Sequence, residues 1–225
     1  MYSIVDHIFG GQGVGGRGMA ATTVALPLTI VTSALALMIG DGCAANMSLC
    51  LGRRQQEEAD RTASHTVTLL VAAGVFLAVA GSLFARQIVL LFGATETAFQ
   101  ASLDYTLIIV GGLPFLLFSS ALTAIIRADG NPKYTMKCMI LGAVINTVLD
   151  PVFIFVFGLD VRGAAIATVL SQCVSALWVL KFLTGKTTIL HIRKKNLRPD
   201  LPLLFSIMAL GISPFVMQST ESLIF

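Results

Sequence analysis

The sequence predicts an all-α polytopic membrane protein, on the strength of its composition and of how the apolar residues are distributed. Hydrophobic residues make up 56% of the 225 residues and charged residues only 12%, and the mean hydropathy is +0.85. Soluble domains carry about 25% charged residues, so this composition excludes a soluble fold. The apolar residues also gather in long stretches separated by short charged segments, as expected for helices that each cross a bilayer with about 20 residues.

The apolar stretches define the expected helices in chain order. The first, Met1–Phe9, would cover only about half of the hydrocarbon core as a helix. We therefore expect the chain to begin within a helix and to be a piece of a longer protein. Six longer spans follow, between charged or glycine-rich segments: Met19–Cys50, Ala63–Phe84, Ala98–Ile126, Tyr134–Phe157, Gly163–Leu183 and Leu203–Phe225. Tilt can absorb the extra length of the longest spans.

Prolines and glycines lie inside several of these spans. Pro27 falls in the first long span, and Gly111, Gly112 and Pro114 fall in the third. Two interpretations stay open at this point. These residues can interrupt the helices of a moving bundle, or the small residues can let neighbouring helices pack closely in the membrane.

The lysines and arginines are distributed unevenly between successive connections. Twelve of the fifteen lie in or beside three connections, around residues 51–62, 127–137 and 185–202. The alternate connections hold only Arg17, Arg86 and Arg162. Because cytoplasmic loops are enriched in Lys and Arg, we expect the three basic connections in the cytoplasm and the spans in the plasma (inner) membrane. This topology accounts for the sequence pI of about 8.8 without a nucleic-acid partner.

Asn146 and Asp150 are polar residues inside the apolar run Met139–Phe157. Four residues apart, they share one face of a helix. A carboxylate in the bilayer centre costs at least about 2.5 to 3.5 kcal/mol, so Asp150 should face a bundle interior, a polar partner or a water-filled cavity. Pro151 has no N–H and leaves the Thr147 carbonyl without its helical partner. A polar, broken helix at membrane depth is where transporters bind ions.

The other acids within the spans are less distinctive. Asp6 also stands in apolar sequence with polar neighbours, and we group it with Asp150 as a candidate functional acid. Asp41, Asp104 and Glu221 are interpreted as interfacial or pore-facing groups.

Motifs for nucleotide or enzyme chemistry are not supported. The glycines of residues 11–16 match G-x-G-x-x-G, but that motif needs a preceding strand in a soluble βαβ unit, and here it follows a membrane helix. The sequence has no Walker-type G-x-x-x-x-G-K-[ST], and no D-D-x-x-D or H-E-x-x-H for metal-dependent chemistry. We expect no cofactor and no enzymatic activity, and we expect an ion gradient to drive any pumping.

Five segments, in the right order and with the right gaps, resemble motifs of the multidrug and toxic compound extrusion (MATE) family. The family patterns are Y-N-x-V-D-x-x-F-I-G, L-G-R-G, R-A-x-G-x-P-K, N-x-x-L-D-P and G-A-A-x-A-T-x-x-S-Q. The matching segments are Tyr2–Gly10, Leu51–Arg53, Arg127–Lys133, Asn146–Pro151 and Gly163–Gln172. Together they cover nearly the whole chain, and their wording is closest to the MepA-like bacterial branch.

The resemblance implies a twelve-helix exporter built from two six-helix lobes. Residues 1–184 would form the N-terminal lobe with its first helix truncated, residues 185–202 a basic cytoplasmic linker, and residues 203–225 the first helix of the C-terminal lobe. The family branch with L-D-P uses a polar cluster in the first lobe for cation or proton coupling. The matching positions here are Asp6, Tyr105, Asn146, Asp150 and Thr168.

The implied activity is secondary active efflux of cationic or amphipathic small molecules in exchange for protons or sodium ions. Poor solvation disfavours the charged form of a carboxyl group, so Asp6 or Asp150 is a candidate for proton uptake. Sodium is equally admissible, since the oxygens of Asp6, Asn146, Asp150 and Thr168 are hard ligands. We expect Pro151 to let the helix bend differently in the two states.

Two alternatives remain from the residues. A related flippase for lipid-linked precursors should have a basic central cavity, yet the span interiors are almost free of Lys and Arg. A membrane-embedded enzyme would need clustered acids. Because the polar face of the first lobe needs the C-terminal lobe of the same protein, we expect the 225 residues alone not to transport.

Overall fold

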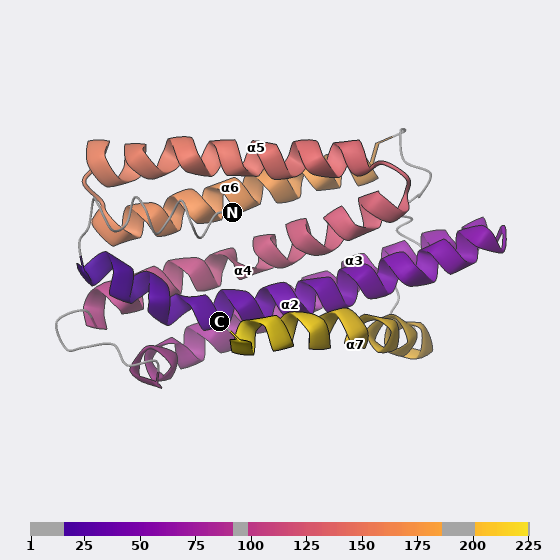
Figure 1. The fold of residues 1–225 in the computed structure, drawn as a ribbon, viewed down its shortest axis with the longest axis horizontal. Helices are drawn as coiled ribbons and strands as arrows, with labels where there is room; N and C mark the ends of the chain where they lie inside the picture. Colours follow the sequence, from indigo (N-terminus) through magenta and orange to yellow (C-terminus); the bar gives the residue numbers. More distant parts are fainter. Residues whose placement is uncertain (1–15, 92–98, 186–200, 225) are drawn as a thin grey trace.

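The computed structural model describes residues 16–91, 99–185 and 201–224, and the described residues contain helices and no strands (Figure 1). The helices are α2 (Gly16–Gly52), α3 (Gln56–Leu91), α4 (Phe99–Ala128), α5 (Pro132–Pro151), the π-helix η1 (Val152–Val156), α6 (Asp160–Leu183) and α7 (Leu201–Ile224). Met1–Phe9 and most of the basic linker lie outside the described residues. Five segments are long and apolar enough to cross a membrane: Ala21–Gly52, Gln56–Leu91, Phe99–Ala128, Pro132–Val156 and Asp160–Leu183. The predicted all-α membrane fold is confirmed.

Successive helices run in opposite directions, so alternate connections lie at the same end of the bundle. The turns from α2 to α3 and from α4 to α5, together with the end of α6, lie at one end (right in Figure 1). The connection from η1 to α6 lies at the opposite end. The structure therefore gathers the basic residues around 53–61, 127–133 and 181 at one end of the bundle, and we call this end the basic end. That it faces the cytoplasm stays a prediction.

Helix α4 is the centre of the bundle. In its most apolar stretch 56% of the residues are buried, compared with 17% in α3, and α4 packs against α2, α3 and α6. A Cβ atom added to Gly40 of α2 would lie 2.7 Å from the Cα of Ala121 in α4, so only glycine allows this approach of the two backbones. Small residues are how membrane helices pack closely, because lipid supplies no hydrophobic force between them.

Pro27 and Pro114 lie inside continuous helices, so neither proline ends its helix. A proline removes one backbone hydrogen bond, but neighbouring helices and side-chain hydroxyls can hold a membrane helix together around it. Near Pro27, the Thr29 hydroxyl donates to the Leu26 carbonyl at 2.8 Å. For Gly112, the interpretation as a close-packing residue holds: an added Cβ would collide with Val169 of α6.

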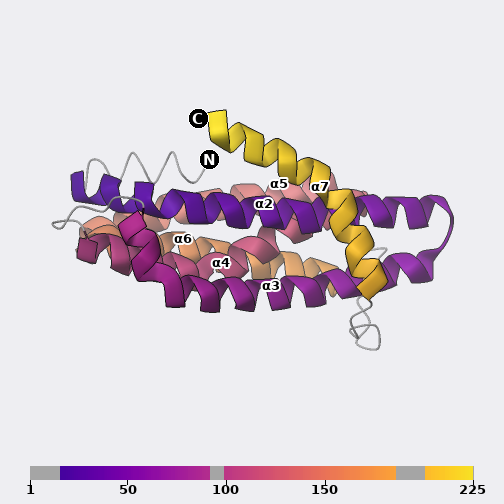
Figure 2. The same ribbon diagram turned by 90° about the horizontal axis from the view of Figure 1, so that it is seen from below.

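Helix α7 crosses α2 obliquely (Figure 2). The closest approach pairs Gly42 of α2 with the backbone of Ile207, and Gly211 of α7 with the backbone of Met38. Ile207 is fully buried in this contact. The predicted division of the chain into an N-terminal lobe, a linker and the first helix of a second lobe stays a prediction.

Candidate functional site

The structure brings three of the predicted site residues into one cluster between α5 and α6. The Asn146 Nδ2 amide donates to Asp150 Oδ1 at 3.3 Å and to Thr168 Oγ1 at 3.4 Å. Asn146 and Asp150 are completely buried, and Thr168 is 6% exposed. We call these three residues the α5–α6 polar cluster. A buried carboxyl group in such surroundings persists only with hydrogen-bond partners, which the cluster supplies.

Two features of the local backbone place the cluster. The spacing of four residues puts Asn146 and Asp150 on one face of α5. On α6, a Cβ added to Gly163 would lie 2.9 Å from the backbone carbon and oxygen of Phe153, so a glycine is needed for α6 to begin this close to η1. The close start of α6 brings Thr168, a little over one turn later, alongside Asn146.

The hydrogen-bonding pattern of the helix changes directly after the cluster. Pro151 ends the α-helical pattern of α5, and the next five residues form the π-helix η1, in which the Phe157 N–H donates to the Val152 carbonyl at 3.1 Å. Short π-helical segments associated with α-helices are frequent at functional sites. The predicted irregularity at Pro151 is therefore present as a change of helix type, and α5 continues into η1 without a gap.

The cluster holds an oxygen set suited to a proton or a hard cation. Asn146 Oδ1 is buried and accepts no hydrogen bond from any described residue. Together with the carboxyl group of Asp150 and the hydroxyl of Thr168, it supplies the ligand type that sodium prefers. No group of three or more His, Cys, Asp or Glu residues that could hold a metal occurs in the described part of the chain.

Two other predicted site residues lie differently. Tyr105 of α4 is 5% exposed and belongs to an apolar cluster that includes Ala21 of α2, Ile154 of η1 and Ala164 of α6. Ile154 lies four residues after Asp150, and Ala164 lies four residues before Thr168. Tyr105 therefore borders the region of the α5–α6 polar cluster. Asp6 lies outside the described residues.

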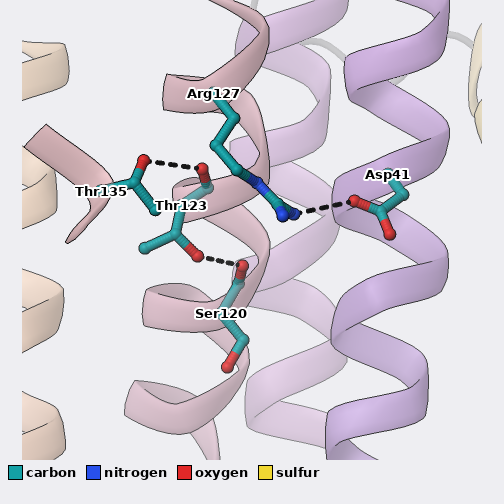
Figure 3. A network of polar contacts seen from close by, with 5 residues as sticks. All are labelled: Asp41, Ser120, Thr123, Arg127 and Thr135. Atoms are coloured by element: carbon teal, nitrogen blue, oxygen red, sulfur yellow. Dashed lines mark hydrogen bonds and ion pairs between the residues drawn. The ribbon is translucent and has the colours of Figure 1, made fainter. Parts of the chain in front are cut away.

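Asp41 and Asp104, interpreted from the sequence as interfacial or pore-facing, form ion pairs between helices. Asp41 of α2 accepts from Arg127 Nη2 of α4 at 3.3 Å (Figure 3). Asp104 of α4 accepts from Arg162 Nη2 of α6 at 2.5 Å and from its Nε at 3.2 Å. The side chains of both arginines are more than half exposed. These pairs link neighbouring helices of the bundle near its two ends.

Figure 3 shows what surrounds the first of these pairs. The Thr123 hydroxyl donates to the Ser120 carbonyl at 2.7 Å within α4. The Thr135 hydroxyl of α5 donates to the Thr123 carbonyl of α4 at 3.3 Å. Arg127 of the R-A-x-G-x-P-K segment therefore links α4 to α2, and the contact between Thr135 and Thr123, on either side of this segment, links α5 to α4.

A buried polar segment at the start of α3 was not predicted from the sequence. Asp60, Thr62, Ser64, His65 and Thr66 are all buried, although the predicted span began only at residue 63. The hydroxyls of Thr62, Ser64 and Thr66 donate to the carbonyls four residues earlier at 2.8 to 2.9 Å. These polar groups are therefore hydrogen-bonded within their own helix, which lets them be buried. The signal in the sequence is the run of hydroxyl side chains itself, because Ser and Thr in a helix can donate to the carbonyl four residues earlier.

Comparison with known proteins identifies the family. The family model described as MatE matches residues 1–152. The chain belongs to the MatE family. This confirms the resemblance found in the five motifs. Four of the motifs lie within the matched residues, and the fifth, Gly163–Gln172, lies beyond them.

Individual MATE proteins are similar over nearly the whole chain. The Multidrug export protein MepA of Staphylococcus aureus (strain MRSA252) is 25% identical over 97% of this chain and 48% of its own length. A crystal structure of a MATE protein in complex with MaD3S is 29% identical, with a TM-score of 0.92 over 99% of this chain and 50% of that one. A Pyrococcus furiosus transporter of the MOP superfamily is 29% identical, with a TM-score of 0.90 over 99% of this chain and 49% of its own. The chain thus spans about half the length of these three relatives.

Proposed function

We propose that this chain is the ion-coupling part of a secondary active multidrug efflux transporter, and that the α5–α6 polar cluster binds the coupling ion. The single observation that carries the proposal is the completely buried carboxyl group of Asp150, hydrogen-bonded to Asn146 beside a π-helical turn. Intramembrane acids are expensive, and they mark ion pathways when they face a bundle interior. Membership of the MatE family supports transport, and not enzymatic catalysis, as the activity.

The geometry around Asn146 suggests how an ion is sensed. When Asp150 carries its charge, the amide nitrogen of Asn146 is the matching partner, as observed. When Asp150 is protonated, its O–H becomes a donor. A half-turn of the Asn146 amide would then present its oxygen, which accepts no hydrogen bond from a described residue, to that donor. Proton binding thus exchanges one set of hydrogen bonds for another.

Sodium would use the same half-turn. With the amide oxygen turned inward, Asn146, Asp150 and Thr168 present three oxygens to one point, and Asp6 is proposed as a fourth ligand. In either case the bound ion cancels the buried charge. We propose that Pro151 and η1 convert this change into a different bend of the helix, while Tyr105 borders the responding region.

The Staphylococcus aureus relative is named a multidrug export protein, which supports small-molecule substrates for this protein. We propose that these substrates are cationic or amphipathic. The Pyrococcus furiosus relative is described as having a binding pocket of reverse polarity that suggests a different function. Substrate charge therefore has to be measured for this protein. We further propose that it resides in the plasma membrane with residues 51–62, 127–137 and 185–202 in the cytoplasm, and that transport requires the C-terminal lobe.

The test is ethidium transport by the protein from the complete reading frame in everted vesicles, where export appears as uptake into the vesicle lumen, under a proton gradient and then a sodium gradient. Asp150→Asn removes the titratable group with little change in size. Thr147→Val is the matched control, because Thr147 is exposed on the same helix and, among the described residues, its hydroxyl donates to the Ala143 carbonyl at 2.8 Å and not to the cluster. We expect efflux to be lost in Asp150→Asn and kept in Thr147→Val.

The outcomes separate the candidate functions. The gradient that drives efflux names the coupling ion. Undiminished efflux in Asp150→Asn would contradict the assignment of the coupling site. If neither gradient moves ethidium although the protein is inserted, flipping of lipid-linked precursors becomes the function to test. Ethidium export by residues 1–225 alone would contradict the requirement for a second lobe.

A further inference from the structure

A pocket unrelated to the α5–α6 polar cluster lies between α5 and α6 at the basic end of the bundle. It has a volume of about 260 Å³ and is lined by Tyr134, Trp178, Lys181 and Phe182. Figure 1 shows α5 and α6 side by side along their whole length, with the start of α5 and the end of α6 at this end. The lining thus combines three aromatic rings with one cation.

The aromatic walls of the pocket are held in place by contacts with each other. The Tyr134 ring lies 4.1 Å from the Phe182 ring and is stacked 6.1 Å from the Trp178 ring, measured between centroids. The Tyr134 hydroxyl donates to the Trp178 carbonyl at 3.3 Å. Trp178 remains 39% exposed. The pocket is therefore preformed and open toward the surroundings of the helices.

Two lysines give the pocket its charge: Lys181 in the wall and Lys137 nearby on α5. The side chain of Lys181 forms part of the wall and is exposed. Lys137 is exposed and follows Tyr134 by three residues on α5, so it is a neighbour of that ring on the helix surface. The lining contains no acidic residue. A pocket with a lysine and no acidic residue in its lining favours a ligand that carries an anionic group.

An exposed apolar stripe leads away from the pocket along α6 toward the middle of the membrane. It consists of Leu177, Val174 and Leu170, which are all exposed and follow helical spacing from Lys181. A ligand with an anionic head and apolar tails would place its head at Lys181 and its tails on this stripe. Aromatic and basic side chains occur together where a membrane helix meets the lipid headgroups.

We propose that this pocket is a binding site for the headgroup of an anionic phospholipid. The phosphate lies against Lys181 with Lys137 nearby, the rings of Tyr134 and Trp178 cover the glycerol region, and the acyl chains follow Leu177, Val174 and Leu170. Basic pockets between membrane helices are known to take anionic lipid headgroups. The site is independent of the proposed transport activity, and an inactive transporter would still bind the lipid.

Native mass spectrometry of the complete protein tests the proposal. The protein is purified in detergent and titrated with phosphatidylglycerol or with phosphatidylcholine of the same acyl chains. We expect phosphatidylglycerol to be retained more tightly than phosphatidylcholine. Lys181→Gln should weaken retention of phosphatidylglycerol about fivefold, the factor expected for one lysine at a membrane surface. Lys181→Arg should preserve it.

Arg53→Gln is the matched control, because it removes one exposed positive charge from the same end of the bundle but away from the pocket. Equal weakening by Lys181→Gln and Arg53→Gln would overturn the proposal, as would equal retention of the two lipids by the unmodified protein. Glycerol phosphate, which has the headgroup chemistry without acyl chains, should not displace the lipid at equal concentration. Displacement would assign the pocket to a free phosphate compound and overturn the lipid assignment.

Discussion

Gly112 of α4 lies directly against Val169 of α6, and we predict that one added methyl group there will push the two helices apart. A Cβ atom at Gly112 would collide with Val169 Cγ2 and would lie 3.3 Å from its Cβ and Cγ1. Valine in a helix has one strongly preferred rotamer, so its methyl groups cannot turn away at little cost. The neighbouring Gly111 is exposed, and an added Cβ would have nothing within 4 Å.

The adjacent glycine allows the magnitude to be isolated. Overpacking a tight contact lowers the free energy of unfolding by about 1 to 3 kcal/mol. Replacing glycine by alanine inside a helix raises it by up to about 1 kcal/mol, and this gain is common to both positions. We therefore expect Gly112→Ala to be about 1 to 3 kcal/mol less stable than Gly111→Ala.

The assay is unfolding of the complete protein by dodecyl sulfate in mixed micelles, followed by far-ultraviolet circular dichroism. A double variant combines Gly112→Ala with Val169→Ala, which removes the valine methyl groups that would collide with the new Cβ atom. The double variant should then be about 1 to 3 kcal/mol more stable than the sum of the two single effects predicts. Equal stability of Gly111→Ala and Gly112→Ala, or additivity to within about 0.5 kcal/mol, would refute the reasoning.

The same displacement has a functional consequence. Val169 follows Thr168, whose hydroxyl accepts from Asn146 at 3.4 Å in the α5–α6 polar cluster. A shift of this part of α6 changes that contact. Gly112→Ala should therefore also slow efflux, and Gly111→Ala should not.

Three further predictions concern the same helices. Asn146→Leu removes the donor to both Asp150 and Thr168, so we expect ion-coupled efflux to fall at least tenfold in vesicles, while the control Thr147→Val stays active. Unchanged coupling in Asn146→Leu would show that Asn146 is not part of the coupling site. Arg162→Gln breaks the pair with Asp104, but the arginine side chain is 59% exposed, so the loss in free energy of unfolding should be below about 1 kcal/mol. The loss should vanish in about 1 M salt, with Arg86→Gln as the control. A loss that persists in high salt would contradict a screened pair. Pro151→Ala returns an N–H partner to the Thr147 carbonyl, so thermal stability should be equal or higher and efflux slower; efflux faster than in the unmodified protein would count against Pro151 as the bending point.

The sequence by itself determined several features that depend on neighbours along one helix. The apolar stretches predicted the approximate bounds of the five membrane-length helices in the described part of the chain, because a bilayer demands about 20 apolar residues for each crossing. The i, i+4 spacing put Asn146 and Asp150 on one face, because backbone hydrogen bonds fix the helical period. The irregularity at Pro151 was predictable for the same local reason, since the missing N–H belongs to the residue itself.

Only the tertiary structure decided which helix faces meet. Thr168 joins Asn146 from 22 residues away, and Asp41 finds Arg127 from 86 residues away. In a soluble protein a polar outer face would reveal how each helix is rotated. These helices are apolar on nearly all sides, because lipid and protein interior are equally apolar, so hydrophobicity does not report the rotation. That rotation is set by close contacts such as Gly40 with Ala121 and Gly112 with Val169, and these appear only when the helices are packed together.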